Sequence, residues 1–305
     1  MPATVLLLGP GDVLHRKVVD HLIAHKDSEP LLNNDVVTPE IRAIVMSGLS
    51  LALAGANVIM QLSQLPVGHG VVESVVEDGA LFRHPLKRAR TTIGYIMIVL
   101  LGSENERSVL RRAVNRQHRL VRAHDNSPVS YNAFDPQLQL WVAACMYRGL
   151  DDAVTMFYPR LPERTLDELY RHSSRFATTL QVPLSLWPAD RRSFDAYWDD
   201  AVTRVTMDDV TRAYLRDVAS LRFLPPVVHR TLGPLHRFIT AGFLGERFRD
   251  ELGLEWNDRR ERVFHQLTKI LALANRRLPS PLREFPMNLS LWDARQRIRL
   301  GRPLV

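Results

Sequence analysis

The clearest chemical feature of this sequence is a histidine on the apolar face of a predicted helix. Ser103 followed by Glu106 is the pattern of a capping box at a helix start. Four residues fall on one face of that helix at spacings of three or four: Leu110, Val114, His118 and Val121. A buried imidazole beside Arg111 and Arg122 is what an axial haem ligand with partners for the haem propionates requires. Periodicity leaves a second interpretation open, in which His118 is a satisfied core histidine.

The segment before Ser103 predicts another helix with polar groups at its start. Arg88, Thr91 and Thr92 precede the apolar run 93–101, and Gly102 ends the helix. A guanidinium is a fixed cation with a planar fork of donors, and a threonine hydroxyl donates one hydrogen bond. Arg88 therefore has the chemistry to bind an anionic group, and Thr92 has that to donate a hydrogen bond.

A break at residues 66–70, followed by a loop to Pro85, is predicted to bring His69 and Glu73 to the start of this helix. Loops of this kind often line a functional site. His69 is a candidate acid or base, or a second axial ligand, and Glu73 is the other candidate for moving a proton. Taken alone, each of these residues is more often a surface residue.

The order and spacing of these residues resemble the MpaB and latex-clearing-protein family, the rubber-oxygenase catalytic domain, over roughly residues 40–285. The matching positions are Pro85, Arg88, Thr92, Gly102, His118, Val121, Tyr131, Ala133, Asp135, Pro136, Trp141 and Val142. The resemblance implies an all-helical fold and haem b bound through His118 as the iron ligand. It also places Arg88, Thr91 and Thr92 on the distal side.

The sequence departs from the family pattern at two positions. The rubber-cleaving members have a lysine where this chain has Thr91, and a threonine does not cap iron as an amine does. Their glutamate base lies about sixteen residues before the arginine, whereas Glu73 lies fifteen before Arg88. These departures point away from polyisoprene cleavage and leave haem binding as the expectation, with an open or water-filled sixth position.

We therefore expect a haem b-dependent oxidoreductase of the oxygenase or peroxygenase type. Its substrate would be a small apolar organic molecule, and its oxidant O2 or peroxide. His118 would hold the iron, Arg88, Arg111 and Arg122 would face propionates, and Thr91 would contact the haem. The alternative is a non-catalytic haem carrier or sensor of the same fold, which would hold haem without turnover.

Composition sets the remaining expectations. The chain has 305 residues and a net charge of +7, without zinc-binding spacing, a P-loop or a concentrated basic block, so we expect no nucleic-acid partner. The single cysteine, Cys145, excludes an internal disulfide and favours a reducing compartment. The first twelve residues lack the basic start and cleavage site of a signal peptide, so a cytoplasmic location is expected.

Helical periodicity and few strand signals predict an all-α fold, a single irregular multi-helix domain enclosing a haem-type pocket. We divide it into an N-terminal helical extension (1–37), an oxygenase-like domain (38–285) and a basic C-terminal tail (286–305) that wraps the surface or lies partly loose. The uncharged run 44–62 is interpreted as one buried helix, because its small and polar residues disfavour stable membrane insertion. The other predicted helices are 13–25, 136–157, 165–180, 192–205, 208–221, 228–252 and 256–278.

Overall fold

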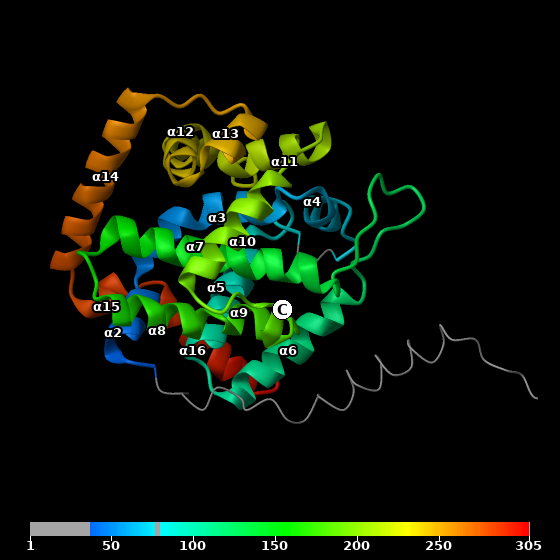
Figure 1. Ribbon diagram of the computed structural model, residues 1–305, viewed down its shortest axis with the longest axis horizontal. Helices are drawn as coiled ribbons and strands as arrows, with labels where there is room; N and C mark the ends of the chain where they lie inside the picture. The colour runs from blue at the N-terminus through cyan, green and yellow to red at the C-terminus, as the bar shows by residue number, and fades with distance from the viewer. Residues whose placement is uncertain (1–36, 77–79, 305) are drawn as a thin grey trace, which may run out of the picture. The chain divides into compact units, whose positions relative to one another are not determined.

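The structure is a computed structural model that describes residues 37–76 and 80–304, and those residues form an all-α fold (Figure 1). Within them the sole β-type pairing is an isolated antiparallel bridge between Arg122 and Asn132. The predicted fold class is therefore confirmed. The predicted helix 13–25 lies outside the described residues. From Thr38 onward the chain packs as one compact unit.

The longest helix, α7 (Pro136–Phe157), runs through the middle of this unit in Figure 1. Its start follows the predicted signal, since the Asp135 side chain accepts hydrogen bonds from the backbone of Gln137 and Leu138. The helix packs against α3, α9 and α14. Trp141, which is fully buried, stacks on Trp198 with ring centroids 5.3 Å apart. A helix buried on most sides is thus the scaffold on which the others assemble.

Two helices carry the predicted site residues. Helix α5 (Pro85–Leu101) buries its apolar second half, and α6 (Glu104–His118) follows after a two-residue turn. The capping box is present as predicted, with Glu106 N donating to Ser103 Oγ and Ser103 N donating to Glu106 Oε2. Both helices are confirmed at their predicted positions.

The run 44–62 is not one helix, and this prediction is wrong. The structure has α2 (Pro39–Val45), a 3₁₀ segment η2 (Gly48–Leu53) and α3 (Ala54–Leu62). A close tertiary approach lies at the interruption: a Cβ at Gly48 would lie 1.9 Å from the carbonyl oxygen of Phe285. No single described helix is long and apolar enough to cross a membrane, although Pro39–Val45 and Gly48–Leu62 pass that test together as a pair bent by 44°.

The predicted break at residues 66–70 is also wrong, because this segment forms α4 (Leu65–Val72). Pro66 lies in the first turn, where a proline costs no hydrogen bond. Gly68 and Gly70 allow the helix to pack closely, since a Cβ at Gly68 would meet the Leu62 carbonyl oxygen at 2.7 Å. His69 is therefore held on a helix rather than on a loop.

The next helices are α8 (Glu163–Ser173), α9 (Arg175–Thr179), the 3₁₀ turn η4 (Leu184–Leu186), α10 (Arg191–Thr203), α11 (Asp209–Ala219), α12 (Pro226–Phe243) and α13 (Glu246–Leu252). The helices predicted at 192–205 and 208–221 are confirmed as α10 and α11. Those predicted at 165–180 and 228–252 are each divided in two. The helix predicted at 228–252 is interrupted at Leu244, whose backbone is extended and ends α12. The carbonyl oxygen of Leu244 accepts a hydrogen bond from the Arg249 guanidinium.

The last part of the chain is helical rather than loose. Helix α14 (Asp258–Arg277) confirms the predicted helix 256–278 and leads through a short turn, α15 (Ser280–Arg283), into α16 (Met287–Arg299). Helix α16 packs along α5, and it approaches closely at Gly94, where a Cβ would lie 3.8 Å from the Ala294 side chain. The segment predicted as a tail thus supports the helix that carries Arg88.

This packing predicts that substitution of two neighbouring leucines of α16 by alanine lowers the free energy of unfolding by very different amounts. Leu291 is 4% exposed and Leu289 is 53% exposed. Leu291→Ala should lower the free energy of unfolding by about 2–4 kcal/mol through lost burial and a residual cavity. The matched change Leu289→Ala should cost less than about 0.5 kcal/mol. Urea unfolding followed by circular dichroism measures both, and equal losses would contradict the described packing of α16.

Candidate functional site

A cavity of about 900 Å³ lies between α4, α5, α6, α7 and α11. Aliphatic side chains form much of its wall: Val67, Val71, Val114, Val121, Leu138, Val142, Met146 and Leu180. The exposed lining residues Val75 and Phe82 mark its opening. This volume is at the upper end of the range for small-molecule and cofactor sites, which are mostly apolar with a few polar groups. The cavity can therefore hold a flat apolar group and a further small molecule.

His118, the last residue of α6, lines this cavity. Its Nδ1 atom is buried and has no hydrogen-bond partner among the described residues, and its ring contacts Phe134 edge to face. Burial, together with the positive charge of Arg88, lowers the pKa of His118 to about 4. The imidazole is therefore neutral at pH 7. A neutral, unpartnered imidazole facing an apolar cavity is the state that metal ligation requires.

Arg88 and Thr92 from α5 line the same cavity, as does Thr91. No carboxylate in the described part of the chain pairs with the Arg88 guanidinium, which lies near Tyr214. Arg88 is an exposed residue that lines the cavity. Desolvation by the surrounding protein lowers the pKa of Arg88, yet an arginine remains charged at physiological pH. A cation that faces the cavity without a counter-ion favours an anionic ligand group. The Thr91 hydroxyl instead donates to the Arg88 carbonyl oxygen, at 3.0 Å.

The other two predicted propionate partners do not line the cavity. Arg122 is exposed, and its guanidinium donates to the Arg119 carbonyl oxygen at 3.0 Å. The Nε atom of Arg111 is buried without a hydrogen-bond partner in the described structure, and its charge acts on Tyr95, which does line the cavity. Arg111 thus lies behind the cavity wall, and the structure brings Arg88 rather than these two arginines to the cavity beside His118.

His69 and Glu73 form a buried ionic network beside the cavity rather than facing it. The His69 ring is 3% exposed, with Nδ1 2.6 Å from Glu73 Oε1 and Nε2 2.6 Å from Asp208 Oδ2. Burial opposes a charge on this ring, but the hydrogen bonds to Asp208 and Glu73 outweigh burial and raise the pKa of His69. Both ring nitrogens are occupied, which leaves no lone pair of His69 for the cavity.

The network also holds the loop that follows α6. Glu73 Oε2 accepts hydrogen bonds from Ser127 Oγ at 2.6 Å and from Tyr131 Oη at 2.9 Å. These bonds and the one from His69 outweigh burial and lower the pKa of Glu73. The Tyr131 ring lines the cavity. Glu73 therefore fixes one cavity wall, formed by the loop from His118 to Tyr131, against α4.

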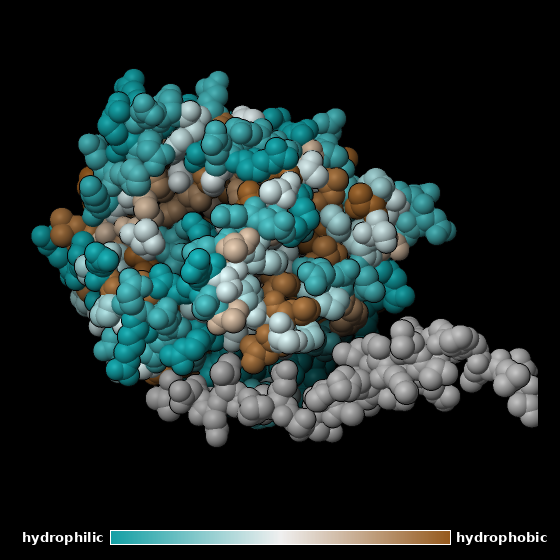
Figure 2. Space-filling model, viewed as in Figure 1, coloured by the Kyte–Doolittle hydropathy of each residue, from teal (hydrophilic) through white to brown (hydrophobic). Residues whose placement is uncertain are grey.

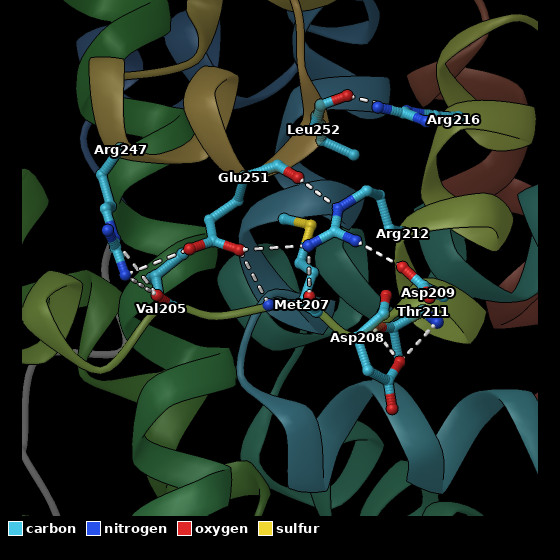
Figure 3. Close-up of polar contacts among 10 residues, drawn as sticks. All are labelled: Val205, Met207, Asp208, Asp209, Thr211, Arg212, Arg216, Arg247, Glu251 and Leu252. Atoms are coloured by element: carbon cyan, nitrogen blue, oxygen red, sulfur yellow. Dashed lines mark hydrogen bonds and ion pairs between the residues drawn. The ribbon is translucent and has the colours of Figure 1, made fainter.

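Asp208 anchors this network to α11 (Figure 3). One of its carboxylate oxygens accepts from the backbone and hydroxyl of Thr211, and the other faces His69. Arg212, one turn further along, donates to the carbonyl oxygen of Glu251 at 2.7 Å and so ties α11 to α13. Asp208 was missed as a site residue, because sequence analysis predicted only that a helix starts at residue 208 or 209. Its contact with His69 spans 139 residues, and the sequence carries no local signal of it.

The side chains of the described residues suit haem better than a metal ion held by protein ligands alone. No group of three or more His, Cys, Asp or Glu side chains in this part of the chain is arranged to hold a metal ion. Cys145 is buried, burial raises the pKa of its thiol, and it does not line the cavity. A porphyrin supplies four of its own iron ligands, so one imidazole suffices. The unpartnered His118 nitrogen, the apolar wall and Arg88 therefore fit haem.

Residues 41–273 match the family model of the ER-bound oxygenase mpaB/B' and rubber oxygenase catalytic domain. The chain belongs to this family. The match confirms the resemblance predicted from the sequence, and it includes α4 to α7 and α11, the helices around the cavity. The family is one of oxygenase catalytic domains.

Two mycobacterial proteins are similar to this family member over most of their length. They are uncharacterized protein Mb2261 of Mycobacterium bovis and uncharacterized protein Rv2237 of Mycobacterium tuberculosis. Each is 46% identical over 253 residues, which cover 83% of this chain and 99% of the relative. No solved structure matches the chain.

Proposed function

We propose that this protein is a haem b-dependent oxidoreductase that oxidises a small apolar organic molecule with O2 or peroxide. The observation that carries the proposal is the cavity that contains a neutral, unpartnered His118 and an uncompensated Arg88 within an aliphatic wall. Membership of an oxygenase family supports it. A cytoplasmic location belongs to the same proposal.

Each cavity residue has a defined part in this proposal. His118 would hold the iron through its ring, and Arg88 would bind an anionic group of the haem. Bound haem would supply the oxidation chemistry, with the protein setting polarity and access. Thr92 would donate a hydrogen bond into the cavity, and the aliphatic wall would orient the substrate and exclude water. Because His69 and Glu73 pair with other protein groups, we assign them to positioning this wall rather than to proton transfer.

Neutralising Arg88 provides a prediction with a matched control. Arg88→Gln removes the cation from the cavity, whereas Arg90→Gln removes a cation that lies outside it, 4.0 Å from Asp293. Loss of a charge-assisted contact of about 1.5–3 kcal/mol should weaken haemin binding by roughly ten- to a hundredfold in Arg88→Gln. Arg90→Gln should bind as the wild type does. Haemin titration of the apoprotein measures both constants, and equal affinities would remove the assigned role of Arg88.

The proposed function is tested in two stages. The absorption spectrum before and after dithionite, with a pyridine haemochrome assay, should show equimolar haem b. Turnover of apolar substrates with O2 or peroxide, compared with free haemin, then separates an oxygenase from a haem carrier or sensor. A protein that stays colourless after addition of haemin would refute the proposal. Bound haem without turnover would show that the protein is a haem carrier or sensor rather than an oxygenase.

A further inference from the structure

The C-terminal helices expose an unusual amount of apolar surface. The apolar residues that are more than half exposed on α15, on α16 and in the turn between them are Leu282, Phe285, Leu289 and Trp292. Leu289 and Trp292 are three residues apart on α16, and they lie on the side opposite the buried residues Met287, Leu291 and Ala294. In Figure 2 the surface over α14 is mostly hydrophilic, with a hydrophobic patch at the left edge, where the helix ends. A contiguous exposed patch of this kind marks an interaction surface.

Helix α14 also exposes apolar side chains. Phe264, Thr268 and Ala272 are buried, whereas Ile270 and Leu273 are exposed on the other side of the helix. On that outer side the apolar residues lie between arginines at both ends of the helix: Arg259 and Arg262 near the start and Arg276 and Arg277 at the end. Long basic side chains can place their charged ends in a polar layer while apolar neighbours enter a less polar one.

The segment that contains α14, α15 and α16 has an excess of positive charge. Residues 258–299 contain ten Lys and Arg against four Asp and Glu, a net charge of +6, whereas the whole chain carries +7. Two of the four carboxylates are engaged locally: Asp293 pairs with Arg297 at 2.8 Å, and Glu261 pairs with His265 at 2.8 Å. Arg295 turns inward to Glu106 of α6 at 3.0 Å, whereas Arg259, Arg262, Lys269, Arg276 and Arg277 of α14 are exposed. The exposed side of α14 is therefore both apolar and basic.

We propose that the outer side of α14–α16 binds the surface of an anionic lipid bilayer. Exposed leucine, isoleucine and tryptophan side chains flanked by arginines are the features of helices that lie in a membrane interface, and anionic headgroups complement the excess of +6. A second copy of the chain is a poorer occupant, because a two-fold interface would bring the same basic surface against itself. The inference does not depend on the proposed haem chemistry.

The test is flotation of the full-length protein with vesicles of phosphatidylcholine alone or mixed with phosphatidylglycerol. The protein should float with the anionic vesicles, and 0.5 M salt should release most of it, since roughly 0.5 M shortens the screening length to a few ångströms. In Arg276→Gln/Arg277→Gln the vesicle affinity should fall by roughly twentyfold, because each arginine near an anionic surface contributes about a fivefold effect. The control Arg230→Gln/Arg237→Gln removes two exposed arginines from α12 and should float normally.

The apolar part is tested with Leu289→Ser/Trp292→Ser, against the control Leu232→Ser/Leu235→Ser on α12, whose two leucines are exposed to a similar extent. The first variant should lose flotation and the second should keep it, with circular dichroism unchanged in both. Absence of flotation, or equal loss in variants and controls, overturns the proposal. Light scattering that shows a dimer dissociated by Leu289→Ser/Trp292→Ser, without vesicle binding, would assign the surface to a second copy and also overturn it.

Discussion

His118→Ala is expected to abolish stoichiometric haem b binding while the helical content stays that of the wild type. The imidazole is the sole histidine side chain lining the cavity in the described part of the chain, and its Nδ1 has no protein partner to lose. Because the side chain is not part of a hydrogen-bond network, removing it should cost little stability. The measurement is the haem content after reconstitution with haemin, from the pyridine haemochrome spectrum, together with far-UV circular dichroism.

The matched control is His265→Ala, which removes a half-exposed histidine of α14 and should leave the haem content unchanged. The pH dependence gives a second readout. The pKa of His118 is about 4, so protons do not compete for its nitrogen at higher pH, and haem affinity should stay constant from pH 8 to pH 5. Full haem content in His118→Ala, or an affinity that falls with a midpoint near pH 6.5, would contradict the assignment of His118.

How far the sequence predicts this molecule depends on whether a signal is local. The capping box at Ser103 and the Asp135 cap lie within four residues of the groups they contact, and the helices they start were predicted correctly. At the break near Gly48 the chain meets Phe285, which is distant in the sequence, and the residues around position 48 did not predict this contact. Local chemistry therefore predicts where most helices begin, and tertiary contacts decide where they are interrupted.

The same distinction applies to the candidate site. Periodicity singled out His118, and the resemblance to the family placed Arg88 in the same site; both line the cavity. Arg111 and Arg122 were predicted to lie on the same side of the helix as His118. The spacing of residues on one helix does not show which other elements pack against that side, and neither arginine lines the cavity. His69 was predicted on a loop, and its two carboxylate partners became apparent only with the fold.

His69→Ala is expected to be among the most destabilising single changes in the chain. It leaves the carboxylates of Glu73 and Asp208, which contact the two different ring nitrogens, without their shared cation, in a site where the histidine is 3% exposed. Removing one partner of a buried ionic group costs about 3–5 kcal/mol, and we expect about 3 kcal/mol here because Asp208 is partly solvated. Urea unfolding of the two proteins at one pH measures the difference.

The pH dependence of that difference identifies its cause. The folded pKa of His69 is raised above 6.5, so its contribution to stability is fully present below pH 6.5 and is lost as the pH rises through the folded value. The pKa values of Glu73 and Asp208 are lowered, so their contribution is present above their ordinary values of 4.5 and 3.8 and is lost in acid. The difference between wild type and His69→Ala should therefore be largest between pH 4.5 and 6.5 and shrink at alkaline pH. A difference that stays constant into the alkaline range would mean that packing of the ring, rather than its charge, holds α4 against α11 and the cavity wall.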